Sequence, residues 1–291
     1  MPWQLTDDLD AYVSAAGDLL GRDPARHTIG LTVVENARAR KVPLAEPETY
    51  GWWTEPDGAV TGACSHTPPH PWVVEVAPGH TRLPLITAWV TAGIGRSRPT
   101  SVNASADLAV ELAALWSGLT GGRATLLWAQ RLFGLDVLRW PEPMPPGSAR
   151  LADENDSALV GEWSLGFARD IGAEATDAVV ASVEQRLESG GMHLWRLDDG
   201  TPASMAARTL PAAGAVRIGP VYTPPGLRGR GYAGAVTAAA SEAALRQVGT
   251  VVLFTDLANP TSNALYPRLG YRPVTDRAVF RLDPPSGGPQ G

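Results

Sequence analysis

The sequence is poor in cysteine and lysine and contains no long apolar run. Cys64 is the only cysteine among 291 residues, so no disulfide can form within the chain. Its neighbours alternate as in a strand, which predicts a buried, unreactive thiol. No stretch approaches the roughly 20 apolar residues of a membrane-spanning helix. The N-terminal residues also lack the basic and apolar regions of a secretory signal. We therefore expect a cytoplasmic protein with no membrane partner.

The sequence also lacks the signatures of a hydrolase of the nucleophile-elbow type, a metal site and a nucleic-acid-binding surface. The sequence has no Gly-x-Ser-x-Gly elbow, which argues against a hydrolase of that type. His66, His70 and His80 lie near prolines and without a pairing cysteine or carboxylate, so we interpret them as loop histidines and expect no metal. The formal net charge of −6 argues against a nucleic-acid partner, which would need a basic surface. The charge is compatible with a cationic or amine substrate.

A proline-rich segment marks the predicted domain boundary. Four prolines occur between Trp140 and Ser148, which excludes a helix or a central strand and indicates an extended linker. We predict a first domain over residues 1–140, a linker over 141–148 and a second domain over 149–283. The Pro/Gly/Ser-rich tail, residues 284–291, is expected to be disordered.

The periodicity of the second half predicts the order strand, two helices, three strands, helix, strand, helix, strand. One strand runs from Ala215 to Tyr222 and is interrupted at Gly219-Pro220, where we expect a bulge or splay. Short elements follow near the C-terminus, with a helix over about Pro260 to Leu269 and a strand over Val279 to Leu282.

The first half repeats a similar order, which suggests a diverged internal duplication. It includes a strand candidate over Arg123 to Trp128 and a helix candidate over Ala129 to Leu135. At the place of the glycine-rich turn of the second half stands the segment Gly79-His80-Thr81-Arg82, without a glycine-rich arginine loop. We therefore expect the first half to have lost cofactor binding.

The segment from Leu227 to Ala233 follows a strand and precedes a helix, which is a favourable place for an anion. A helix N-terminus offers free N–H groups, and two glycines allow the backbone to approach a pyrophosphate closely. Arg228 and Arg230 add positive charge. No Gly-Lys-Ser/Thr sequence follows, so this is not a Walker loop, and it is not a Gly-x-Gly-x-x-Gly turn. The alternative is an arginine-rich surface turn without a ligand.

The pattern Arg228-x-x-Gly231-x-Ala233 resembles the Q/R-x-x-G-x-G/A motif of the GNAT superfamily of acyltransferases. The resemblance implies an α/β (α+β) fold of two GNAT-like domains, each with a mixed, mostly antiparallel sheet flanked by helices, the N-terminal one degenerate. It also implies acetyl-CoA as co-substrate. By this resemblance, the cofactor-binding residues are Val221, Tyr222, Thr223, Arg228, Gly229, Arg230, Gly231, Tyr232 and Ala233.

The segment from Asn259 to Tyr271 supports the same family. Asn259 suits the N-cap of a helix and Gly270 its C′ position. Asn259, Ser262 and Tyr266 are spaced to share one helix face. The segment resembles the GNAT pattern N-x-x-[SA]-x-x-x-Y-x-x-x-G-[FY]. The resemblance implies that these three side chains contact the cofactor and that Tyr266 is the general acid that protonates the leaving thiolate. The alternative is a tyrosine that packs against CoA without proton transfer, and Pro267 beside it is unusual inside a helix.

The general base is less well defined by the sequence. Glu162 on the first helix of the second half is our candidate catalytic base, and Asp256 at the end of a strand is the alternative. Either carboxylate can instead be solvated or structural, and we expect His193 to be structural.

The sequence thus predicts an N-acetyltransferase that transfers acetyl from acetyl-CoA to a primary amine by direct attack in a ternary complex. The acceptor class is a small-molecule or peptide amine, and the chain can be a monomer or a homodimer. The rival hypotheses are a non-catalytic acyl-CoA sensor or scaffold, and an acyltransferase that uses a different acyl-CoA.

Overall fold

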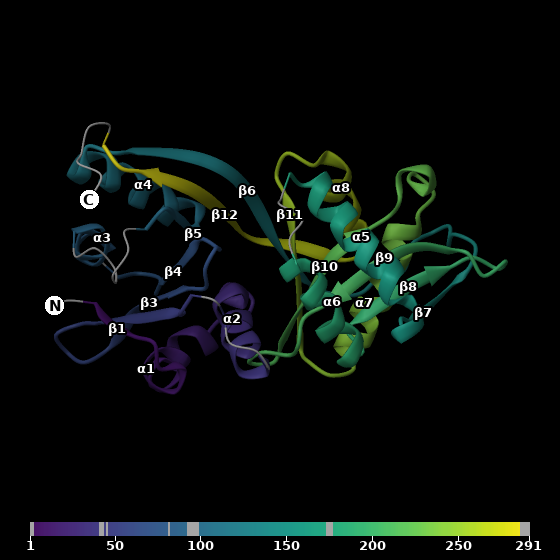
Figure 1. Ribbon diagram of the computed structural model, residues 1–291, viewed down its shortest axis with the longest axis horizontal. Helices are drawn as coiled ribbons and strands as arrows, with labels where there is room; N and C mark the ends of the chain where they lie inside the picture. The colour runs from purple at the N-terminus through teal and green to yellow at the C-terminus, as the bar shows by residue number, and fades with distance from the viewer. Residues whose placement is uncertain are drawn as a thin grey trace. The chain divides into compact units, whose positions relative to one another are not determined.

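The chain forms two compact units (Figure 1). A computed structural model describes residues 3–40, 44, 46–80, 82–91, 99–172 and 177–285, without the side chains of 177, 178 and 180–182. Unit 1 comprises Met1–Leu132, Asp256–Ala258 and Val274–Gly291, and unit 2 comprises Phe133–Thr255 and Asn259–Pro273. No helix within these described ranges is both long and apolar enough to cross a membrane.

Unit 1 is a mixed sheet with a pair of helices on each face. Its strands lie in the order β1-β2-β3-β4-β5-β12-β6. Among the strand pairs recorded for the described residues of this unit, β4–β5 is parallel and the others are antiparallel. Helices α1 and α2 cover one face, and α3 and α4 cover the other. The elements of the first half are β1 Gln4–Thr6, α1 Leu9–Gly21, α2 Thr28–Ala39, β2 Thr49–Thr54, β3 Val60–His66, β4 Trp72–Val76, α3 Arg82–Thr91, β5 Ser101–Ser105, α4 Ala106–Thr120 and β6 Arg123–Leu135.

Unit 2 has the same construction. Its strands lie in the order β11-β10-β9-β8-β7, with β10 and β11 parallel and the other recorded pairs antiparallel. Helices α5 and α6 cover one face, and α7 and α8 the other. The elements of the second half are β7 Ser148–Leu151, η1 Glu154–Asp156, α5 Ser157–Asp170, α6 Asp177–Glu188, β8 Met192–Arg196, β9 Pro202–Arg208, β10 Ala215–Tyr222, η2 Pro225–Leu227, α7 Tyr232–Leu245, β11 Thr250–Asp256, α8 Pro260–Arg268 and β12 Tyr271–Asp283.

The two halves of the chain therefore repeat one element order. Each has a strand, two helices, three antiparallel strands, a helix, a parallel strand, a helix and a final strand. This repeat supports the internal duplication, and the mixed, mostly antiparallel strand pairing within each unit confirms the predicted fold class. The final strands are distributed unexpectedly, because residues 274–283 of β12 belong to unit 1, and residues 133–135 of β6 belong to unit 2.

The compact units differ from the predicted domain limits. The chain passes into unit 2 at Phe133, before the proline-rich segment, and residues 274–291 group with the first half of the chain. Residues 141–147 form neither helix nor strand, as expected, but they belong to the compact unit 2. Pro145 is buried, and the Trp195 indole donates a hydrogen bond to the Pro146 carbonyl over 2.9 Å. Most of the predicted tail, residues 286–291, lies outside the described residues.

Two predictions about the final strand of each half were wrong. Residues 129–135 are not a helix but the second half of β6. Pairing overrides their helical spacing, since the Ala129 carbonyl accepts a hydrogen bond from the Leu257 N–H over 3.0 Å. The last strand begins at Tyr271 rather than at Val279. Tyr271 is buried, but residues 272–276 are partly or fully exposed, so the apolar pattern of the sequence shows only the buried end of the strand.

The core of unit 1 is unusually aromatic. Trp3, Trp53, Trp72 and Trp89 are all buried between the sheet and α3. The Trp3 indole donates a hydrogen bond to the Leu85 carbonyl over 3.1 Å, and the rings of Trp72 and Trp89 meet edge to face. Cys64 is buried among these residues, and burial raises the pKa of its thiol, which confirms an unreactive thiol.

Candidate functional site

Strand β10 carries the predicted irregularity at Gly219-Pro220. Its parallel pairing with β11 is recorded up to Ile218, which lies opposite Leu253. On the other side, the register with β9 shifts between Ile218 and Val221, which confirms a bulge. Gly219 adopts a φ of +140°, which favours glycine. In the described register, the end of β10 therefore pairs with β9 alone, so its other edge can take a ligand.

The glycine-rich turn after β10 presents an open helix N-terminus. Gly229 and Gly231 have φ values of +78° and +86°, and Gly231 is the N-cap of α7 without a side-chain cap. Among the described residues, no acceptor is recorded for the N–H groups of Tyr232, Ala233 and Gly234. These free donors lie at the positive end of a helix dipole, which is the arrangement that binds phosphate.

Arg228, the first residue of the motif, is directed at protein groups. Its Nε donates to the Thr223 carbonyl over 2.9 Å, and its Nη2 pairs with Asp170 Oδ2 at the end of α5 over 2.5 Å. The guanidinium also lies over the Tyr222 ring, 5.7 Å from its centroid. Arg228 thus ties the turn to β10 and α5. Arg230 is exposed and donates to the Gly226 carbonyl over 3.2 Å.

Two residues that the sequence did not single out shape the end of β10. Ser204 Oγ on β9 donates to the Tyr222 carbonyl over 2.9 Å and lies 2.8 Å from Thr223 Oγ1. Gly166 on α5 leaves room for the Tyr222 phenol, because a Cβ at that position would lie 2.7 Å from its hydroxyl oxygen. Neither residue belongs to a motif, so only the fold reveals these contacts.

Helix α8 begins as predicted. The Asn259 side chain caps it and accepts a hydrogen bond from the Ser262 N–H over 3.1 Å, and Pro260 occupies the first turn. The helix packs on the first turn of α7, since a Cβ at Gly234 would lie 3.2 Å from Leu265 Cδ1. This contact brings α8, which carries Asn259, Ser262 and Tyr266, beside the glycine-rich turn.

Tyr266 lies in the core of unit 2. Its ring contacts Phe133 and Tyr271 at centroid distances of 6.2 and 6.0 Å. Burial raises its pKa to about 12, although a hydrogen bond with the Ser262 side chain acts in the opposite direction. The phenol is therefore protonated at neutral pH, as a proton donor must be.

The candidate bases occupy different surroundings. Glu162 is exposed on α5. Asp256 Oδ1 accepts a hydrogen bond from the Ala258 N–H over 2.8 Å, so this carboxylate stabilises the turn after β11. His193 is buried, and burial, followed by the nearby Arg208 and Arg246, lowers its pKa to about 4. Its neutral, buried imidazole is consistent with a structural role.

The stability of the protein is expected to fall as the pH rises from 10 towards about 12. Tyr266 keeps its proton in the folded state up to about pH 12, whereas an unfolded tyrosine ionises near pH 10. Ionisation therefore favours the unfolded chain in this window. Urea unfolding from about pH 9 to 12 measures the slope. Tyr266→Phe is expected to flatten it, and equal slopes in both proteins would contradict this.

These features define a class of fold. A mixed sheet whose parallel strand pair parts at a bulge, followed by a glycine-rich turn and an uncapped helix, is the arrangement implied by the GNAT resemblance. Residues 197–280 match the family described as FR47-like protein. None of the curated proteins matches this chain.

Solved structures of GNAT proteins share the fold over nearly the whole chain. A tandem GNAT protein from the clavulanic acid biosynthesis pathway is 18% identical, with a TM-score of 0.59 over 99% of this chain and 100% of that chain. A GCN5-related N-acetyltransferase from Kribbella flavida is 23% identical (TM-score 0.57, 92% of this chain and 96% of that one). One from Sphaerobacter thermophilus is 15% identical (TM-score 0.60, 98% and 96%). The chain thus has the GNAT fold over both halves, which confirms the resemblance predicted from its motifs.

Proposed function

We propose that this protein is an N-acetyltransferase whose unit 2 binds acetyl-CoA and transfers the acetyl group to a primary amine. The observation that carries the proposal is the uncapped N-terminus of α7 behind two left-handed glycines. The residues fit the group, because free N–H donors and a close backbone approach suit a pyrophosphate. The open edge of β10 beyond Gly219 suits an extended pantetheine chain.

The bound thioester would supply an activated acyl carbon, and the protein supplies position and a proton. A neutral amine attacks the carbonyl carbon, a C–N bond forms, and the C–S bond breaks. In this proposal, the sulfur leaves as a thiolate that takes the Tyr266 proton. Because a thiol is a fair leaving group, the acid contributes modestly. Glu162 is our candidate to accept the proton of the amine, directly or through water.

Unit 1 is proposed to be a scaffold that binds no cofactor. The turn between β4 and α3 has no counterpart of the arginine-containing motif of unit 2. The space between the sheet and α3 is filled by Trp3, Trp72 and Trp89, where α7 offers alanines. Aromatic packing there stabilises the unit, which suits a scaffold.

The proposal is tested by thiol release from acetyl-CoA with a panel of small primary amines and peptides. Tyr266→Phe is expected to lower kcat about ten- to hundredfold, because the leaving thiolate loses its proton donor. Tyr12→Phe, which alters a buried tyrosine of unit 1, is the control and should retain activity. Binding of acetyl-CoA without turnover on any amine, together with unchanged behaviour of Tyr266→Phe, would favour a sensor instead. Turnover with another acyl-CoA but not with acetyl-CoA would show that the protein uses a different acyl donor.

A further inference from the structure

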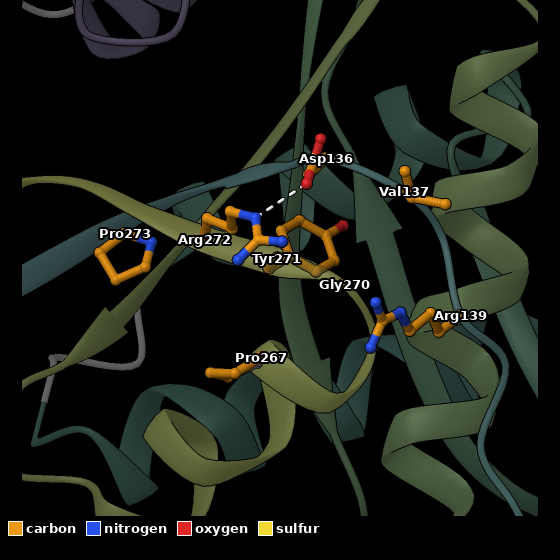
Figure 2. A pocket seen from close by; sticks show the side chains of 8 residues that line it. All are labelled: Asp136, Val137, Arg139, Pro267, Gly270, Tyr271, Arg272 and Pro273. Atoms are coloured by element: carbon orange, nitrogen blue, oxygen red, sulfur yellow. Dashed lines mark hydrogen bonds and ion pairs between the residues drawn. The ribbon is translucent and has the colours of Figure 1, made fainter.

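Unit 2 contains a cavity that the proposed reaction does not use. Its volume is about 350 Å³, and it lies where α8 ends and β12 begins (Figure 2). Its walls come from residues 136–139 and from residues 267–273. None of the residues assigned above to acetyl-CoA or to catalysis lines it.

The cavity is held open by main-chain contacts between these two segments. The Asp136 N–H donates to the Gly270 carbonyl over 3.1 Å, and the Arg139 N–H donates to the Leu269 carbonyl over 3.0 Å. Gly270 has a φ of +95°, and a Cβ there would overlap the Val137 carbonyl oxygen. Because the segments meet this closely, the walls are preorganised rather than formed by a ligand.

The charges around the cavity favour an anion. Arg272 Nε donates to Asp136 Oδ2 over 2.8 Å, so the charge of the Asp136 carboxylate neutralises that of the Arg272 guanidinium. The Arg139 guanidinium has no recorded hydrogen-bond or ion-pair partner in the part of the chain that the structure describes. Two cations therefore face one anion, on a chain whose net charge is −6. Figure 2 shows Arg139 and Arg272 among the side chains that line the cavity.

The rest of the wall is apolar. Val137, Pro267 and Pro273 contribute hydrocarbon surface, and the Tyr271 hydroxyl is turned into the core, where it lies 2.7 Å from Ser241 Oγ. A bare inorganic ion would leave this surface uncovered. An organic anion would cover it and place its charge against the arginines.

We propose that this cavity binds a small organic carboxylate, with the carboxylate against Arg139 and Arg272 and an apolar body against Pro267 and Pro273. Guanidinium groups match the two oxygens of a carboxylate, and the prolines contact the apolar part of the ligand. The proposal concerns a second site and does not depend on acetyl transfer.

Calorimetric titration of the full chain with benzoate at fixed ionic strength tests it. Saturable binding of one benzoate is expected, and Arg139→Gln/Arg272→Gln should weaken it at least about tenfold, since two charge-assisted contacts are lost. Arg246→Gln is the matched control and should bind as the natural protein does, because that arginine is exposed, does not line the cavity, and forms its recorded ion pair with Glu242. If the double variant does not fold, Arg139→Gln alone serves, since its guanidinium supports no recorded contact in the described structure.

Two further ligands test separately whether the carboxylate and the apolar body are both needed for binding. Benzyl alcohol should bind far more weakly than benzoate, and equal binding would overturn the role of the arginines. Sodium phosphate should also bind more weakly, and tighter binding than benzoate would overturn the organic ligand. Absence of saturable benzoate binding, or binding that the double variant leaves unchanged, would overturn the site itself.

Discussion

A chain that stops after Pro273 is expected to lose the folded state of unit 1. The missing residues include Arg277–Arg281, which pair with β5. Ala278, Val279 and Leu282 are buried in the core of unit 1. Burial of each large apolar side chain contributes about 1.5–3 kcal/mol, and a domain is stable by only about 5–15 kcal/mol in total. Loss of the strand segment 274–283 therefore removes most of the stability available to unit 1.

The ion pair of Arg277 adds to this loss. Arg277 Nη1 lies 2.8 Å from Glu75 Oε1, its Nε donates to Asn103 Oδ1 over 2.9 Å, and the two charged side chains are only 2% and 8% exposed. Without Arg277, the Glu75 carboxylate is left buried and unpaired. Breaking a buried pair in this way costs about 3–5 kcal/mol.

Urea unfolding followed by tryptophan fluorescence measures both effects. Arg277→Met should be strongly destabilised, and the additional change Glu75→Gln should restore part of the loss because it removes the unpaired charge. A chain that stops after Pro285 is the control for shortening and should unfold at the natural midpoint. An equal midpoint for the chain that stops after Pro273 would show that β12 does not stabilise unit 1.

The second large effect is expected for Gly231→Val, which should weaken acetyl-CoA binding at least about hundredfold, or roughly 2.7 kcal/mol. Gly231 has a φ of +86°, which a β-branched residue strongly resists, and its Cβ would also approach Pro145 at 3.7 Å. The turn must change its path to accept the valine. The N–H groups of α7 then no longer converge on a phosphate.

Gly226→Val is the matched control in the same turn. No atom lies within 4 Å of a Cβ built on Gly226, and that glycine has no positive φ in the structure. Calorimetry with acetyl-CoA compares the two variants, and thermal melting checks that both are folded. If Gly231→Val binds acetyl-CoA as well as Gly226→Val does, the cofactor is not held by this turn.

The sequence predicted the local features of unit 2 well. Asn259, Pro260 and Gly270 mark the ends of α8 because capping and turn geometry depend on single residue types. The bulge at Gly219-Pro220 could be predicted for the same reason. Such signals are complete within a few residues, so they need no knowledge of the tertiary structure.

Features that depend on distant partners could not be predicted. Residues 129–135 have helical spacing, but neighbouring strands make them part of β6. Arg277 resembles a surface residue, and only Glu75, far away in the sequence, explains its burial. In the candidate site, the contact between Arg228 and Asp170 joins a predicted phosphate-binding side chain to the end of α5, a role that the motif does not contain.

The exchange of final strands has a consequence for the synthesis of the protein. The strand segment that completes unit 1, residues 274–283, is made after all of unit 2. During synthesis, unit 1 therefore stays incomplete, because β5 lacks its neighbour β12 until the end of the chain is made. The strands of unit 2 are made earlier and can pair before that point. A gene cut at the proline-rich segment would not yield two independent proteins, because its first product would lack a strand encoded by the second.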